Sequence, residues 1–204
     1  MTLKDIIKFS TLLTKLQNTK RVIYVCNENR LENDVEHSYM LAMLAWYFVE
    51  SDHLDLDVAK IIQYAMVHDL VEVYAGDVYL YETNQTIRNN KHKKERQAAA
   101  RIRREFPKFQ QLHTLIQAYE GKVDAESKFV YALDKVQPVI QIYLDRGRTW
   151  NKKKITLKML IDAKKDKVAL SKPVRHAFDE LVSFLKHREK KLFKFKYHDP
   201  RTRS

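Results

Sequence analysis

Glycine and proline are almost absent from this chain, and their scarcity restricts the fold more than any other feature of the sequence. Only 3 Gly and 4 Pro occur among the 204 residues. Tight turns between β-strands depend on these two residue types, so a sheet protein of this length needs many more of them. The sequence therefore predicts an all-α fold. Its hydrophobic content of 45% is enough for the core of a single domain.

Apolar residues recur at helical spacing along most of the chain. Clear helices are predicted in DVEHSYMLAMLAWYFVES, in VAKIIQYAMVHDLVEVY as far as Gly76, and in DAESKFVYALDKVQPVIQIYLDRG, which Pro138 is expected to bend. Two basic amphipathic helices are predicted over 151–170 and 173–192, and the stretch TKRVIYVCNENRLEND is predicted to be a loop. No strand is expected. The domain is predicted to span 1–192, followed by a basic, disordered tail over 193–204.

The net charge of +12 is concentrated in lysine-rich segments after residue 150. Such an excess favours anionic partners, which include phosphorylated metabolites, nucleic acid and the acidic face of another protein. The single cysteine, Cys26, excludes an internal disulfide. The sequence has no apolar run long enough to span a membrane and does not start like a signal peptide, so we expect a cytoplasmic protein without a membrane partner.

Ionisable side chains interrupt the apolar faces of three predicted helices. His37, His68 and Asp134 each fall on the inward side of a different helix. Such groups are rarely buried unless they are paired or bind a metal, and imidazole together with carboxylate suits Mn, Fe, Co, Ni or Zn. The pattern predicts a divalent metal site. The alternative is a buried polar network without a metal, with Asp134 paired to Arg101 or Lys135.

The set His37, His68-Asp69 and Asp134 resembles the signature of the HD-domain metal-dependent phosphohydrolases. RLENDVEHS is similar to R-x-E-N-V-x-E-H-S of the bacterial 5′-deoxyribonucleotidase branch, and HDLVEVYAGDV is similar to its H-D-x-x-E-x-x-x-G-D-[IVL] segment. The resemblance covers roughly residues 1–145. The chain departs from the branch where an early Arg-Trp pair is replaced by Arg21-Val22, and where the apolar residue before His37 is displaced by one position.

This resemblance implies a single-domain helical bundle of the HD-domain type. It also implies that His37, His68, Asp69 and Asp134 bind one divalent transition-metal cation (Mn, Co, Fe, Ni or Zn, with Mg less favoured). The expected reaction is hydrolysis of a phosphate ester.

Further roles follow from the resemblance and from position along the chain. Glu72, at i+4 from His68, is expected to transfer a proton, and Asp77 is expected to assist the leaving 5′-oxygen or to contact the sugar. The alternative for Glu72 is a helix-end carboxylate paired to a lysine. Arg21 is the expected phosphate-binding arginine, and Lys91 and Lys94 could clamp further phosphates or form part of a solvated helix face.

The leading hypothesis is a hydrolase of deoxynucleoside 5′-monophosphates that releases nucleoside and phosphate. A (deoxy)nucleoside triphosphohydrolase is the alternative among enzymes, because surplus lysines suit a longer phosphate chain. A nucleic-acid-binding helical module with a vestigial site is the non-enzyme alternative, and it is not favoured. A homodimer is compatible with the resemblance, but no sequence stripe defines an interface.

Overall fold

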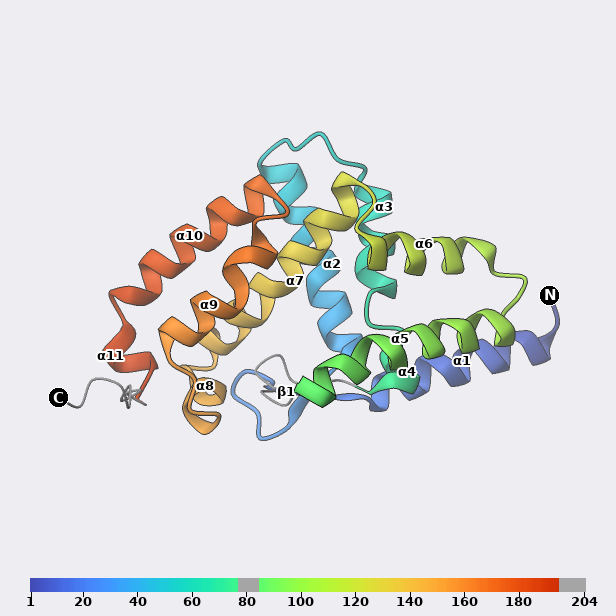
Figure 1. Cartoon of the computed structure of the whole chain (residues 1–204), viewed down its shortest axis with the longest axis horizontal. Coiled ribbons are helices and arrows are strands. Elements are labelled where there is room, and N and C mark those ends of the chain that lie inside the picture. The colour runs from blue at the N-terminus through green and yellow to red at the C-terminus, as the bar shows by residue number, and fades with distance from the viewer. Residues whose placement is uncertain (77–84, 195–204) are drawn as a thin grey trace.

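A computed structural model describes residues 1–76 and 85–194, and it consists of helices with one small β-hairpin (Figure 1). The helices of the described ranges are α1 (Leu3–Asn18), α2 (Asp34–Ser51), α3 (Val58–Val67), α4 (Glu72–Ala75), α5 (Gln85–Glu105), α6 (Gln110–Gly121), α7 (Ala125–Leu144), α8 (Arg148–Lys152), α9 (Leu157–Val168), α10 (Lys172–Lys186) and α11 (Glu189–Leu192). The strands are β1 (Lys20–Tyr24) and β2 (Leu31–Asn33). The all-α prediction is confirmed. No helix of the described ranges combines the length and the apolar character that a membrane crossing requires.

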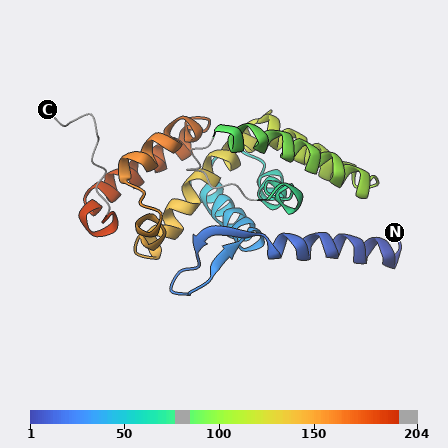
Figure 2. The same cartoon turned by 60° about the horizontal axis from the view of Figure 1, so that its bottom comes forward.

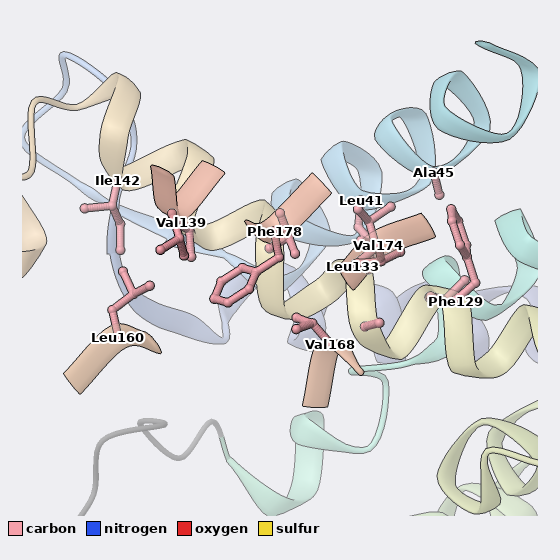
Figure 3. Packing of buried hydrophobic residues seen from close by; sticks show 14 of the residues in the cluster. Leu41, Ala45, Phe129, Leu133, Val139, Ile142, Leu160, Val168, Val174 and Phe178 are labelled. Carbon is pink, nitrogen blue, oxygen red and sulfur yellow. The ribbon is translucent and has the colours of Figure 1, made fainter. Parts of the chain in front are cut away.

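Helix α7 occupies the centre of the molecule, as Figure 1 shows, and it packs against α2 and α3 as well as against α9 and α10. Figure 3 shows the resulting core, in which Leu160 of α9 lies near Ile142 of α7 and Phe178 of α10 lies between Val139 and Leu133 of α7. Leu41 of α2 packs into the same cluster. The last helices therefore share one hydrophobic core with the segment that carries the predicted metal ligands.

A second cluster of buried residues joins α1 to the turn after α3 and to α5 and α6. Leu12 and Leu16 of α1 contribute to it, together with Leu70 and Val71 of that turn and Ile102 of α5. This cluster fixes the segment around His68 and Asp69 from the side opposite to α7.

The segment predicted to be a loop contains an antiparallel hairpin, which corrects the expectation that the chain has no strand. Lys20 pairs with Asn33 and Tyr24 with Leu31, with an irregularity between the two pairs. β1 has the sequence KRVIY, whose β-branched and aromatic residues favour a strand. The turn includes Asn27 at φ 61°. In Figure 2 the hairpin lies between α1 and α8 and contacts both.

Three predicted helices are interrupted in the structure. The helix expected to run to Gly76 ends at Val67 and resumes as the short α4, and Gly76 closes α4 at φ 77°. The helices expected over 151–170 and 173–192 are each divided, into α8 and α9 and into α10 and α11. Amphipathic spacing continues across these breaks and therefore does not reveal them. Helix α7, in contrast, continues through Pro138.

The chain remains in contact with the domain beyond residue 192, since the backbone N–H of Lys194 donates to Oδ1 of Asn151 at 2.8 Å. Phe193 is buried and stacks on Trp150 with ring centroids 4.5 Å apart. The rest of the predicted tail, 195–204, lies outside the described residues.

Replacing Phe178 by alanine is expected to lower the free energy of unfolding by about 3–5 kcal/mol. The side chain is only 1% exposed and belongs to the core around α7, so truncation leaves a cavity there. Urea unfolding measures the change, with Tyr47→Ala as the control because Tyr47 is 70% exposed. A loss below 1 kcal/mol would show that α10 is not part of the cooperative unit that includes α2 and α7.

Candidate active site

His37 is held on the first turn of α2 by a well-capped helix start. The side chain of Asn33 accepts hydrogen bonds from the backbone N–H groups of Val35 and Glu36, each at 3.0 Å. In return, Oε2 of Glu36 accepts a hydrogen bond from the backbone N–H of Asn33 at 3.1 Å. This capping box fixes the direction in which α2 leaves the hairpin and points His37 into the interior, where it is fully buried.

The break after α3 lets two adjacent residues face one point. Neighbours on a continuous helix diverge by about 100°, which separates their side chains. Here the backbone N–H of Leu70 bonds to the carbonyl of Val67 at 3.1 Å, and the N–H of Glu72 bonds to the carbonyl of Asp69 at 2.9 Å. These i→i−3 bonds tighten the chain into a turn. As a result, His68 and Asp69 lie side by side, with Nε2 and Oδ2 3.0 Å apart.

Asp134 projects from the middle of α7 and completes a group of four side chains. Nε2 of His37 lies 3.0 Å from Oδ1 of Asp134 and 3.9 Å from Oδ2 of Asp69. Nε2 of His68 lies 3.9 Å from the same Asp134 oxygen. The structure thus brings together all four predicted metal ligands, which come from α2, the turn after α3, and α7.

The hydrogen bonds around the two histidines leave both Nε2 atoms directed at the carboxylates. Nδ1–H of His68 donates to the carbonyl oxygen of Ala65 at 2.8 Å, and Nδ1–H of His37 donates to Oε1 of Gln137 at 3.0 Å. Burial lowers the pKa of His37 to about 4, so its imidazole is neutral. Bonds of this kind select the tautomer that a metal-binding histidine requires.

The facing groups form an arrangement that suits a cation. Buried Nε2 of His68 has no hydrogen-bond partner of acceptable geometry among the described residues. Burial opposes protonation, but the negative charge of Asp69 raises the pKa of His68, so this pair attracts a positive charge. Two imidazole nitrogens and two carboxylate oxygens at these distances match the donor set of a divalent transition metal. The residues present fit such an ion.

Two cationic side chains lie against the carboxylates of this group. Arg21, on β1, donates through Nη1 to Oδ2 of Asp69 at 2.7 Å and to Oδ1 of Asp34 at 3.2 Å. Lys135 contacts Oδ2 of Asp134. Burial favours the neutral acids, but His68 and Arg21 hold the pKa of Asp69 below its usual range, and Lys135 and His37 do the same for the pKa of Asp134. Both carboxyl groups are therefore ionised.

A cavity of about 560 Å³ opens onto His68, Asp69 and Asp134. Its size is within the range of about 300–1,000 Å³ that is typical for small-molecule sites. Arg21 lines it as well, so the arginine expected to bind phosphate borders the same space as the predicted metal ligands. The cavity therefore provides a place for a phosphorylated ligand next to these ligands.

The remaining predicted site residues have different positions. Glu72, 6% exposed, and Lys91 both line the cavity, with Oε1 and Nζ 3.9 Å apart. Lys94 is exposed and is not part of the cavity lining. Asp77 lies outside the described residues.

Sequence reasoning missed several groups at this site. Gln137 could have been found from its position three residues after Asp134, on the same face of α7. Lys164 carried a weaker signal, since it occupies an inward position of α9, midway between Leu160 and Val168, and is 4% exposed. A lysine at such a position is unusual enough to mark a site.

The family model described as HD domain matches residues 13–174 of the chain, which reaches beyond the resemblance seen in the sequence. Among curated proteins, 5′-deoxynucleotidase HDDC2 of Bos taurus is 28% identical over 141 residues, which are 68% of this chain and 66% of that protein, just under two thirds. The Homo sapiens protein of the same name is also 28% identical over 141 residues, which are 68% of this chain and 67% of that protein.

Solved structures show the same relationship. A crystal structure described as a predicted metal-dependent phosphohydrolase from Magnetospirillum magnetotacticum superposes with a TM-score of 0.75 at 28% identity, covering 91% of this chain and 96% of that one. An HD-domain phosphohydrolase from Listeria innocua, at 18% identity, shares the fold with a TM-score of 0.63 and covers 93% of both chains. Since the family model matches most of the sequence, this chain belongs to the HD domain family.

Proposed function

We propose that the chain is a metal-dependent phosphohydrolase that acts on nucleotides, with deoxynucleoside 5′-monophosphates as its substrates. The convergence of His37, His68, Asp69 and Asp134 carries this proposal, together with the cavity that the last three of them line. The relatives named 5′-deoxynucleotidase support the choice of substrate. The products would be a nucleoside and phosphate.

The proposed cofactor is one divalent transition-metal cation held by these four side chains. Two imidazole donors favour Mn, Co, Fe, Ni or Zn over Mg, which prefers oxygen ligands and retains its water. When bound, such an ion supplies Lewis acidity toward a phosphoryl oxygen and toward water.

The side chains around the ligands have separate proposed roles. Arg21, whose Nη1 is 2.7 Å from Oδ2 of Asp69, can hold a phosphate oxygen through charge-assisted hydrogen bonds. Glu72 lines the same cavity, where it can accept a proton from the attacking water and return one to the leaving 5′-oxygen. Lys91, whose Nζ is 3.9 Å from Glu72, keeps a positive charge beside that carboxylate. For Asp77 the proposal rests on the sequence alone.

A panel of nucleoside mono- and triphosphates, assayed with Mn, Co, Ni, Zn and Mg, tests this function. We expect release of inorganic phosphate from deoxynucleoside 5′-monophosphates with a transition metal, and weaker activity with Mg. Release of pyrophosphate or triphosphate from the longer substrates would instead identify a triphosphohydrolase, which the further lysines in the cavity lining would suit.

Absence of turnover with every metal, together with a salt-dependent shift of DNA mobility, would identify the nucleic-acid-binding alternative. The basic charge of the chain is compatible with that outcome. The four ionisable side chains that converge in the interior argue against this alternative, since a nucleic-acid-binding module without catalysis does not require them.

A further inference from the structure

The cavity continues past the predicted metal ligands to a wall built by the C-terminal part of the chain. The lining residues from α7, α8 and α9 include Lys135, Val139, Ile142, Trp150, Lys164 and Lys167. Most of this wall is apolar, and three lysines interrupt it. None of these lysines has a role in the proposed function as stated so far.

Lys164 is a buried cation with incomplete compensation. Its side chain is 4% exposed, and Nζ donates to the backbone carbonyl of Lys135 at 2.7 Å. An ammonium group has three N–H donors, and no carboxylate of the described residues lies within ion-pair distance of this one. Burial and the positive charge of Lys135 lower the pKa of Lys164 to about 7. Asp134 opposes this lowering but lies outside ion-pair distance, so an anion in the cavity in contact with Lys164 would stabilise its charged form.

Further donors face the same part of the cavity. Lys167 follows Lys164 by three residues on α9, and Lys135 lies directly after Asp134. Oγ1 of Thr149, a residue only 2% exposed, has no hydrogen-bond partner among the described residues. This side of the cavity therefore offers positive charge and hydrogen-bond donors next to a predicted metal ligand, which is the chemistry that an oxyanion requires.

We propose that Lys164, together with Lys135 and Lys167, forms a phosphate-binding subsite on the α9 side of the cavity. The inference deepens the proposed function, since it places a phosphate group of the substrate between α9 and the predicted metal ligands. The group is either the phosphoryl group that is cleaved or a further phosphate of a longer nucleotide. Both present the same oxyanion to the lysines.

Titration of inorganic phosphate into the full-length, Mn-loaded protein by calorimetry tests the subsite. Lys164→Met is expected to weaken phosphate binding about tenfold or more, because it removes a buried charged donor but keeps a side chain of similar length. Lys165→Met is the matched control, since Lys165 is exposed on the same helix and lies 3.6 Å from Asp162. We expect its affinity to stay within about twofold of the unaltered chain.

Lys164→Met is expected to fold, because an apolar replacement of a poorly compensated buried charge is often neutral or stabilising. Should it nevertheless fail to fold, Lys167→Met provides the second test, with an expected weakening of several-fold. Unchanged affinity in the folded variants would overturn the subsite. An equal loss in Lys165→Met, or no phosphate binding by the unaltered chain, would overturn it too.

Substrate kinetics then identify the phosphate that the subsite holds. An equal rise of KM for deoxyadenosine mono- and triphosphate in Lys164→Met assigns the cleaved phosphoryl group, and a rise confined to the triphosphate assigns a further phosphate. The phosphate-binding subsite and the nucleotidase function can be rejected independently of each other. If Lys164→Met selectively loses phosphate binding but the unaltered chain hydrolyses no nucleotide, the result supports the subsite and rejects the nucleotidase function.

Discussion

Asp69→Ala is expected to remove nearly all turnover and most of the bound metal. Oδ2 of Asp69 lies 3.0 Å from Nε2 of His68 and supplies negative charge to the proposed metal site. Mutation of a residue that only hydrogen-bonds to a metal ligand lowers metal affinity or activity by about 10–100-fold. Loss of a ligand itself should therefore lower metal affinity and activity by at least about 100-fold. Elemental analysis of purified protein measures the metal, and phosphate release from a deoxynucleoside 5′-monophosphate measures turnover.

Asp55→Ala is the control for this change, because Asp55 is exposed and lies outside the cavity lining. A thermal melt adds a readout that is independent of activity. A ligand at 100 times its Kd stabilises the native state by about 2.7 kcal/mol, so Mn should raise the Tm of the unaltered chain and of Asp55→Ala, but not that of Asp69→Ala. If Mn stabilises none of them and the unaltered chain binds no metal, the four side chains form a buried polar network instead.

The helical fold and the inward positions of His37, His68 and Asp134 were predictable because they leave local signals, and Asp69 joined the set through the family resemblance. Scarcity of Gly and Pro indicates helices, and an ionisable residue such as His37 or Asp134 on an apolar face indicates a buried site. The break between His68 and Glu72 was missed because the apolar spacing continues through it. Its cause is tertiary: Leu70 and Val71 pack into the cluster formed with α1, α5 and α6. Such packing overrides helix propensity and is not encoded in the local pattern.

The part of the cavity lining that α9 contributes could not be predicted from the sequence, for a different reason. Lys164 is close to Asp134 only because α9 packs back onto α7, and its hydrogen bond to Lys135 joins residues that are 29 positions apart. The many lysines after residue 150 looked like a solvated basic surface, and for Lys165 that interpretation agrees with its exposure. A helical period alone cannot distinguish the lysine that faces the cavity from its neighbours.

Glu72→Gln is expected to reduce turnover by about 10²–10⁴-fold while the metal stays bound, the range over which a positioned proton donor or acceptor contributes. The amide keeps the size of the carboxylate but cannot accept a proton from water. Glu72 is 6% exposed and lines the cavity. It is not one of the four proposed metal ligands, which lie within 3.9 Å of one another's atoms in the pairs given above. Its effect should therefore be separable from that of Asp69, with metal content near that of the unaltered chain.

Glu120→Gln makes the matched comparison, because Glu120 also lines the cavity but is exposed at its edge. Glu120→Gln also removes one negative charge from the cavity, but the turnover of this variant should stay within a few-fold of normal. A large effect confined to Glu72→Gln would therefore depend on the position of Glu72 and not on the loss of charge alone. A pH profile adds a mechanistic test, since removal of a general base also removes the ionisation that it contributes to the rate. Near-normal turnover in Glu72→Gln would exclude proton transfer by this residue, and loss of metal from the variant would make Glu72 a ligand in place of a base.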